Sequence, residues 1–314
     1  MKLRDDFIIG AEKHLLPIYR ISPFKTSDIL KNKKIRLENK VGIENYLSVR
    51  YKGKRVLLTE NGRSALRLAL QCLKLEENDI VTIITTSNKL YISSCVTNEI
   101  EKVCNWSRVI EEKTRVILIN HEFGFCCSNL KKYASLGYPI IEDFAHSFIS
   151  NTDKLDAGRY GDYLIFSFSK YFPIQCGGAL IYKGESCLLD NNSEISGYVE
   201  NVTSAYLDSI NEIRQKRVNN YKYYEGLFLS LGLRPYFSLK ENDCPGVFCF
   251  KTPDGVDLNK LKEFVNANGI ESSVFYGEQA YFLPCHQNLN YADLDFIYMV
   301  VREFLEDYCV VREY

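Results

Sequence analysis

The sequence predicts an α/β protein with a large domain built on a mostly parallel sheet and a small C-terminal α+β domain. The first observation is an alternation of apolar strand-like runs and helix-like runs from about residue 55 to 182. Strands that alternate with helices are typical of a parallel sheet covered on both faces. The second observation is a change of pattern after residue 200, where longer amphipathic stretches take over. A chain of 314 residues, 46% of them apolar, is long enough to bury both cores.

In the large domain, runs rich in β-branched residues and bounded by turn residues predict the strands. The first run, Arg55–Thr59, is broken by Asn61-Gly62. The stretch that follows, Ser64–Leu75, is apolar almost all round, which predicts a buried helix. The further predicted strands are Asp79–Thr86, Thr114–Asn120, Tyr138–Glu142, Asp162–Ser169 and Gly177–Tyr182.

The C-terminal part begins with a long, mostly amphipathic helix predicted over Val202–Leu229, which connects the two regions and ends before Gly232 and Pro235. Two predicted strands, Gly246–Phe250 and Ile270–Tyr276, flank a predicted helix over 257–267. A last helix is predicted where apolar residues recur at helical spacing, at Ile297, Val300, Val301, Phe304 and Leu305. We therefore expect a large domain over 1–229, with the connecting helix, and a small domain over 230–314.

The composition argues against several classes of function. The 39 basic and 40 acidic residues balance, whereas nucleic-acid binders usually carry a basic excess. No stretch approaches the roughly 18 apolar residues of a membrane-spanning helix, and none has the pattern of a signal peptide. The 11 cysteines lack the paired spacing of a zinc site, so no metal is expected. Buried, reduced thiols in a cytoplasmic protein are the favoured interpretation.

Polar groups follow the predicted strands at three places, as ligand-binding residues do in open α/β sheets. The first segment, Thr59–Leu66, joins a strand to a helix through Gly62, and both an ordinary capped turn and a phosphate site fit it. The second, Ile140–His146, ends an apolar strand in Glu142 and Asp143. A buried carboxylate needs a partner, for which a protonated ring nitrogen of a ligand and a nearby Arg or Lys are both candidates.

The third segment, Gly161–Gly178, places Lys170 between a strand and a Gly-Gly turn. Lysines are usually solvated, but aromatic residues at positions 166, 168, 171 and 172 bracket this one. Desolvation lowers the pKa of a lysine, which is what a Schiff-base nucleophile requires. Lys170 is therefore a candidate nucleophile.

Together these segments resemble the DegT/StrS-type sugar aminotransferases, over roughly residues 40 to 308. The resemblance implies a pyridoxal 5'-phosphate (PLP) enzyme of fold type I, in which the large domain has a sheet of the seven-stranded type. The family's motifs occur here in the family's order: a Ser-Gly-Thr-Ala-Leu-like turn at Asn61–Leu66, a His-x-Tyr/Phe-Gly turn at His121–Gly124, a Glu-Asp-x-Ala-Gln/His strand end at Glu142–His146, Gly-Asp-x3-Phe-Ser-Phe at Gly161–Phe168 before Lys170 and Gly177-Gly178, and Leu-Pro-x-His at Leu283–His286.

The resemblance implies a role for each matching residue. Lys170 would hold the cofactor as a Schiff base and carry the proton between substrate and cofactor. Asp143 would keep the pyridine nitrogen protonated, so that the ring acts as an electron sink. His146 would lie near the phenolic oxygen, and Tyr91 would stack on the ring. His121 is expected to be a structural turn residue.

The cofactor's phosphate would be bound by Ser167 and by the backbone of Gly62, Arg63 and Ser64. Arg63 departs from the family, which usually has Thr or Ser there; its guanidinium either binds phosphate itself or points elsewhere. The Gly-Tyr-Asn segment that reaches the neighbouring subunit in the family is also altered, because Val199 follows Gly197-Tyr198.

The activity implied is transfer of an amino group from glutamate or glutamine to a keto-sugar nucleotide, in a homodimer with the active site at the subunit interface. Two alternatives stay open. A non-catalytic or degenerate relative with a binding or regulatory role would account for Arg63 and the altered Gly-Tyr-Asn segment. A PLP-dependent sugar dehydratase of the same superfamily is disfavoured by Lys170, because those members replace the lysine with histidine.

Overall fold

The structure is a computed structural model that describes residues 17–36, 41–150, 156–184 and 193–306. Its contacts divide the chain into two compact units. The large unit comprises Phe24–Asn211 and Asn242–Cys244, and the small unit comprises Met1–Pro23, Glu212–Glu241 and Pro245–Tyr314. Most of the predicted connecting helix thus groups with the C-terminal strands. The division into domains 1–229 and 230–314 stays a prediction.

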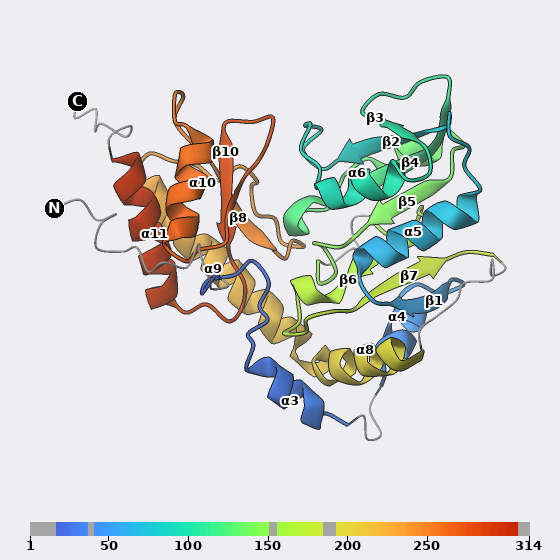
Figure 1. Ribbon diagram of the computed structural model, residues 1–314, viewed down its shortest axis with the longest axis horizontal. Helices are drawn as coiled ribbons and strands as arrows, with labels where there is room; N and C mark the ends of the chain where they lie inside the picture. The colour runs from blue at the N-terminus through green and yellow to red at the C-terminus, as the bar shows by residue number, and fades with distance from the viewer. Residues whose placement is uncertain (1–16, 37–40, 151–155, 185–192, 307–314) are drawn as a thin grey trace. The chain divides into compact units, whose positions relative to one another are not determined.

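The large unit is built on a seven-stranded sheet with the order β1-β7-β6-β5-β4-β2-β3 (Figure 1). Strand β7 is antiparallel to both neighbours, and the other adjacent pairs are parallel. The predicted α/β class with a mostly parallel sheet of seven strands is therefore confirmed. The strands are β1 (Arg55–Thr59), β2 (Ile80–Thr85), β3 (Asn105–Ser107), β4 (Thr114–Asn120), β5 (Ile140–Asp143), β6 (Tyr163–Ser167) and β7 (Gly178–Tyr182).

One face of this sheet is covered by α5 (Gly62–Leu73) and α6 (Ser94–Ile100), which lie side by side (Figure 1). The central strands are buried on both faces, so their side chains alternate between two cores. In β4, Val116 and Leu118 join the core beneath α5, whereas Ile117 and Ile119 are buried outside that cluster. Each such fully buried side chain contributes roughly 1.5–3 kcal/mol of transfer free energy.

Aromatic rings fill a second buried cluster. Phe148 lies at its centre, with ring centroids 5.5 Å from those of Phe168 and Phe172 and 5.8 Å from that of Phe166. Phe144 stacks on Phe166 at 5.3 Å. The other helical segments of the large unit are α3 (Asp28–Lys34), α4 (Ile43–Arg50), η1 (Glu122–Gly124), α7 (Leu130–Ala134), η2 (Phe168–Lys170), α8 (Ser193–Ala205) and η3 (Leu207–Ser209).

The prediction of one continuous helix over Val202–Leu229 is wrong. Helix α8 ends at Ala205, and α9 (Ile210–Leu229) begins five residues later. A short 3-10 turn separates the two helices. Tyr206 at this break packs its ring 6.0 Å from Phe172 and donates its hydroxyl to Asn32 Oδ1 at 3.1 Å. Tertiary packing of this tyrosine therefore accompanies a break that the hydrophobic periodicity does not reveal.

The small unit contains a three-stranded antiparallel sheet of order β8-β10-β9, with β8 (Val247–Lys251), β9 (Ser273–Val274) and β10 (Ala280–Pro284). The helices α9, α10 (Leu258–Ala267) and α11 (Tyr291–Leu305) belong to the same unit. A capping box between Asn290 and Asp293 begins α11. The predicted strand over 270–276 is shortened to β9, and β10 was not predicted.

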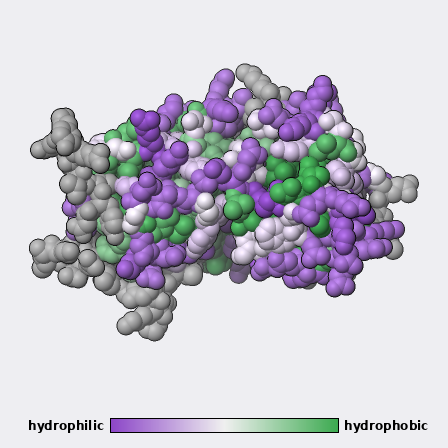
Figure 2. Space-filling model, turned by 90° about the horizontal axis from the view of Figure 1, so that it is seen from above, coloured by the Kyte–Doolittle hydropathy of each residue, from purple (hydrophilic) through white to green (hydrophobic). Residues whose placement is uncertain are grey.

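The surface seen in Figure 2 is mostly hydrophilic, broken by small hydrophobic groups. Leu90, Val109 and Val41 are among the large apolar side chains exposed in the described part of the chain. Within that part, no helix is both long and apolar enough to cross a membrane.

Candidate active site

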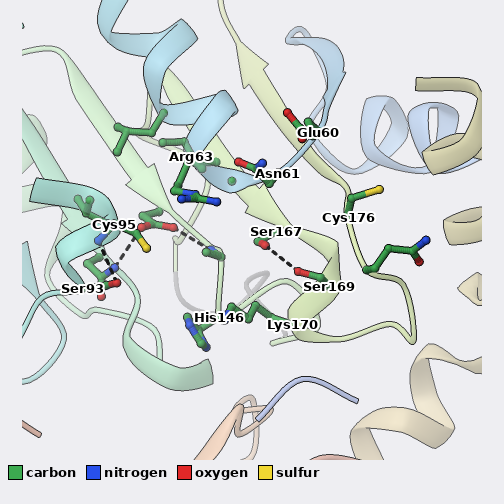
Figure 3. A pocket seen from close by; sticks show the side chains of 18 residues that line it. Glu60, Asn61, Arg63, Ser93, Cys95, His146, Ser167, Ser169, Lys170 and Cys176 are labelled. Atoms are coloured by element: carbon green, nitrogen blue, oxygen red, sulfur yellow. Dashed lines mark hydrogen bonds between the residues drawn. The ribbon is translucent and has the colours of Figure 1, made fainter. Parts of the chain in front are cut away.

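A cavity of about 520 Å³ lies at the carboxyl edge of the seven-stranded sheet (Figure 3). Asn120, Asp143 and Ser167 reach it from the last residues of β4, β5 and β6. Parallel strands end at a common edge, so the sequence brings these side chains together through the sheet alone. Lys170, just after β6, lines the same cavity as Asp143.

Asp143 is the buried carboxylate of this cavity, which the exposed Glu60 also lines. It is 5% exposed; its Oδ1 accepts from the Ala145 N–H at 2.8 Å and its Oδ2 accepts from Asn120 Nδ2 at 3.2 Å. Burial raises the pKa of Asp143, while these two hydrogen bonds and the nearby His121 act in the lowering direction. A cation that reached this carboxylate would offset the cost of its burial.

Glu142, its neighbour in sequence, points away from the cavity, because successive strand residues face opposite sides. The Glu142 side chain is fully buried and accepts from the N–H groups of Gly158 at 2.8 Å and Gly161 at 2.6 Å. His121 Nε2 lies 3.1 Å from Glu142 Oε2, and His121 Nδ1 accepts from the Cys127 N–H at 3.0 Å. This pattern assigns the imidazole proton to Nε2 and makes Glu142 and His121 a structural pair.

The start of α5 supplies donors for an anion. Asn61 caps the helix, its Oδ1 accepting from the Ser64 N–H at 3.0 Å. The N–H groups of Gly62 and Arg63 have no acceptor among the described residues. The positive end of the helix dipole adds to these donors, and this combination favours phosphate. The exposed Arg63 guanidinium, unpaired within the described structure, lines the cavity.

Gly62 lies where α5 closely approaches β6. A Cβ at position 62 would lie 3.3 Å from Ser167 Cβ and 3.6 Å from the Phe166 carbonyl oxygen. Ser167 is buried, and its Oγ is 3.4 Å from Ser169 Oγ. Figure 3 shows Asn61 and Arg63 on one side of the cavity and His146 and Lys170 on the other, with Ser167 and Ser169 between them.

Lys170 is half-buried and sits at the end of η2, on a loop that is fixed at both ends. The Phe168 N–H donates to the Gly177 carbonyl at 2.9 Å, and Ser167 pairs with Gly178 across β6 and β7. The bracketing aromatics predicted from the sequence are fully buried beneath the loop. Tyr171 donates its hydroxyl to the carbonyl oxygens of His146 and Cys244, which ties the loop to the segment after β5.

His146 lines the cavity, but Tyr91 and Ser64 are not among its lining residues. The Tyr91 ring lies 5.5 Å from Phe123, whose ring is 5.4 Å from that of His146. Ser64 directs its N–H to Asn61 and accepts from Arg67 Nη2 at 3.1 Å. The predicted contacts of Tyr91 and Ser64 with a cofactor thus stay predictions.

Several lining residues were missed by the sequence analysis. Asn120 ends a strand that was predicted correctly, so the rule applied to Asp143 would also have found it. Ser93 and Cys95 come from the start of α6, and Gln175 and Cys176 from the loop before β7. None of these four lies in a motif with a recognisable chemical role.

Comparisons with known proteins agree with this geometry. A family described as "Putative PLP-dependent aminotransferase" matches residues 43–183, which include every strand of the large sheet. The fold is similar to that of a "Putative sugar aminotransferase Spr1654 from Streptococcus pneumoniae, PLP-form", with a TM-score of 0.70, 17% identity, and 91% of this chain and 97% of that chain covered.

The chain thus has the fold of the PLP-dependent sugar aminotransferases. Helicobacter pylori PseC, an "aminotransferase involved in the biosynthesis of pseudoaminic acid", has a TM-score of 0.67, 16% identity and coverage of 93% and 100%. A DegT DnrJ EryC1 StrS aminotransferase from Brucella abortus has a TM-score of 0.65, 16% identity and coverage of 88% and 93%. No curated protein matches by sequence.

These findings confirm the resemblance and the fold type predicted from the motifs. The matching family is described as PLP-dependent and the similar structures as aminotransferases, one of them in a PLP form, which agrees with the predicted enzyme class and cofactor. The roles of individual residues stay predictions.

Proposed function

We propose that the protein is a PLP-dependent aminotransferase that transfers an amino group from glutamate or glutamine to a keto-sugar nucleotide. One observation carries the proposal: Lys170 and Asp143, which come from different strand ends, line a single cavity together with the start of α5. The sugar substrate is supported by the printed descriptions of the similar structures, two of which name sugar or pseudoaminic acid chemistry.

The residues of the cavity fit the cofactor. Its volume of about 520 Å³ is within the usual range for small-molecule sites. The free N–H groups of Gly62 and Arg63, the Arg63 guanidinium and Ser167 are the donors that would hold the phosphate. Asp143 would hold a proton on the pyridine nitrogen, and the positive charge there would favour the ionised carboxylate. When bound, pyridoxal phosphate supplies an electron sink for negative charge at the substrate carbon.

Lys170 has two tasks in this proposal. Its Nζ would anchor the cofactor covalently, and once released it would move the proton at the reacting carbon of the substrate. Backbone hydrogen bonds fix both ends of its loop, and Lys170 lines the cavity. His146, on the same side of the cavity in Figure 3, would contact the cofactor's phenolic oxygen.

We also propose a homodimer whose second subunit completes the substrate site. The support is the resemblance to the family and the presence of large apolar side chains, such as Leu90 and Val109, on the surface of the large unit. Light scattering tests this proposal, and a monomeric mass at micromolar concentration would exclude it.

Lys170→Ala is the variant that tests the function. After purification with pyridoxal phosphate, the wild type should absorb visible light, and borohydride reduction should leave the cofactor on the peptide that contains Lys170. In Lys170→Ala we expect no label and a loss of amino transfer by several orders of magnitude, because both tasks of Nζ are lost. Mass spectrometry and the visible spectrum measure these outcomes.

The matched control is Lys131→Ala, which removes an exposed lysine of α7 in the same unit. It should keep both the label and the activity. A folded wild type that binds no pyridoxal phosphate, or a label on another lysine, would refute the proposal. A labelled Lys170 whose spectrum does not change with any amino donor would favour the non-catalytic alternative, for which Arg63 is the specific observation.

A further inference from the structure

A second cavity, of about 360 Å³, lies at the opposite edge of the same sheet. Lys54 precedes β1 and Lys183 follows β7, where Arg55 and Tyr182 are paired. The strands β1, β6 and β7 therefore run between this cavity and the candidate active site. We call it the basic cavity; the charged residues that line it are Arg50, Lys52, Lys54, Asp156, Arg159 and Lys183.

Positive charge dominates the lining. Five of these residues are cationic and one, Asp156, is acidic. Asp156 pairs with Arg159 at 3.2 Å, and Lys183 lies 3.7 Å from Asp162, but all four side chains are well exposed. Ion pairs of this kind neutralise little in water. Lys52 makes no ion pair within the described part of the chain.

Arg50 and Lys54 both donate hydrogen bonds to backbone carbonyl groups. Arg50 donates from Nη1 to Phe148 O and from Nη2 to Ser150 O, each at 3.0 Å. Lys54 Nζ donates to the carbonyl oxygens of Gly158 at 2.7 Å and Gly161 at 2.8 Å. These hydrogen bonds hold the two cationic groups in place, and Lys54 Nζ has no hydrogen-bonded carboxylate among the described residues. An ammonium has three N–H donors, and the third of Lys54 has no acceptor among the described residues.

Lys54 is half-buried, and this burial shifts its pKa. Burial lowers the pKa of Lys54 to about 8, and repulsion from Lys183 acts in the same direction. Glu142 and Asp162 act in the opposite direction, so the positive charge is only partly compensated. An anion in the cavity would stabilise the charged form of Lys54 and offset its repulsion from Lys183.

One wall of the basic cavity is fixed by hydrogen bonds. The turn from Gly158 to Gly161 is held from one side by Lys54 and from the other by the buried Glu142, which accepts both of its glycine N–H groups. Tyr51 lies behind the cations, its ring centroid 5.4 Å from Arg50 and 6.0 Å from Lys54. A Cβ at Gly158 would lie 2.6 Å from Tyr51 Cε1, so only glycine fits there. A preformed site loses little entropy on binding.

We propose that the basic cavity binds a compact anion that carries phosphate groups. Arg and Lys donors converging on a small volume match phosphate oxygens in charge and in hydrogen bonding. The volume of about 360 Å³ is near the lower end for small-molecule sites, which suits pyrophosphate or the diphosphate part of a larger molecule. This site is separate from the candidate active site, and the proposal does not depend on the proposed function.

Titration calorimetry with pyrophosphate at pH 7 and low ionic strength tests the proposal. The protein is first loaded with pyridoxal phosphate, which occupies the helix start at α5. We expect saturable binding that weakens as salt is added. Lys52→Glu, an exposed charge reversal at the cavity, should weaken binding by roughly tenfold or more, because an attraction becomes a repulsion.

Two further variants separate this site from the other possible anion site. Lys131→Glu, a charge reversal elsewhere on the large unit, should leave pyrophosphate binding unchanged. Arg63→Ala, studied without cofactor, should keep the binding that Lys52→Glu weakens. The proposal is overturned if pyrophosphate shows no saturable binding, if Lys52→Glu has no effect, or if Arg63→Ala abolishes the binding. A protein that fails to take up pyridoxal phosphate would contradict the proposed function while leaving the Arg63→Ala titration interpretable.

Discussion

Two adjacent carboxylates at the end of β5 have different surroundings and therefore different roles. Glu142 is fully buried, and its oxygens are occupied by two backbone N–H groups and His121. Asp143 accepts one hydrogen bond on each oxygen and lines the cavity. The alternation of side chains along a strand separates the two. The sequence left open which groups are the partners of these carboxylates. In the structure, the partners of Glu142 are His121 and two backbone N–H groups.

The replacement Asp143→Asn keeps the shape of the side chain and removes its charge. Burial raises the pKa of Asp143 above that of an unfolded aspartate, so the stability it contributes is present at low pH and lost as the carboxyl ionises. Cofactor-free Asp143→Asn should therefore be as stable as the wild type at pH 7, or more stable. Its affinity for pyridoxal phosphate should fall by roughly ten- to a hundredfold, because a charge-assisted hydrogen bond is lost.

Thermal melts of the cofactor-free proteins and a fluorescence titration with pyridoxal phosphate measure these two effects. Glu112→Gln, at an exposed carboxylate, is the control and should change neither. Unchanged cofactor affinity in Asp143→Asn would exclude Asp143 as the partner of the pyridine nitrogen.

At the scale of single elements, the start of α5 decides whether an anion can approach. Gly62 begins the helix where it meets β6, whereas Gly226 lies in an exposed part of α9 with nothing within 4 Å of an added Cβ. The two glycines therefore make a matched pair, one beside the cavity and one in open space.

We expect opposite results from the two Gly→Ala replacements. Gly226→Ala should stabilise the protein by about 0.5–1 kcal/mol, the usual gain inside a helix. Gly62→Ala should show no such gain, because its Cβ would press on Ser167 Cβ at 3.3 Å. If the neighbouring groups shift to accommodate this Cβ, the phosphate contacts should lose about 1 kcal/mol, which weakens pyridoxal phosphate binding roughly fivefold. Denaturant unfolding and cofactor titration measure both; stronger binding in Gly62→Ala would contradict the assigned phosphate site.

Elements with a strong local pattern were predictable from the sequence, and those set by tertiary contacts were not. The buried strand β4 was predicted with both ends correct, because its apolar run is bounded by turn residues. The edge strand β3 has three residues, two of them exposed, so no pattern marks it. The break between α8 and α9 coincides with the packing of Tyr206 on Phe172, which periodicity cannot show.

The candidate site was predictable where the sheet assembles it. Asp143, Ser167 and Lys170 follow strand ends, and the common edge of the sheet brings them into one cavity. The position of the Tyr91 side chain depends instead on the course of the loop after β2, whose sequence shows no regular hydrophobic pattern. That loop turns the Tyr91 ring toward Phe123. Phe123 itself has φ 52°, a left-handed backbone conformation that is rare for phenylalanine and cannot be predicted from the residue type.

On the scale of the whole molecule, buried carboxyl groups make stability depend on pH. Glu122 is 2% exposed; its Oε2 accepts from the Ser87 N–H at 2.6 Å, and its Oε1 has no hydrogen-bond partner in the described structure. Burial raises the pKa of Glu122 to about 7, although Ser87 and Arg108 act in the lowering direction. The carboxyl is therefore neutral in the folded protein at pH values where it is ionised in the unfolded chain.

The sign of the effect follows from this shift. The contribution of Glu122 is fully present below the pKa of the unfolded group and is lost as pH rises through about 7. The free energy of unfolding should thus fall by on the order of 1–3 kcal/mol between pH 5 and pH 8. Glu122→Gln should remove most of this decrease, since an amide does not ionise.

The single tryptophan, Trp106, lies in the large unit with Glu122, so its fluorescence follows the unfolding of that unit. Urea titrations at several pH values, read by this signal, measure the decrease. Glu112→Gln serves again as the exposed control and should keep the pH dependence of the wild type. An unchanged slope in Glu122→Gln would show that other groups cause it.

The antiparallel placement of β7 has a consequence for how this scaffold tolerates change. Because Ser167 pairs with Gly178, the segment between them is a loop whose exit is set by the ladder of β6 and β7 and not by the residue at position 170. The half-buried side chain at position 170 can therefore be exchanged while every rung of the ladder persists, provided that the buried aromatic residues around it are kept. The fold of this sheet and the chemistry of the residue at position 170 therefore depend on different parts of the sequence. A substitution at position 170 could change the reaction while the sheet still forms.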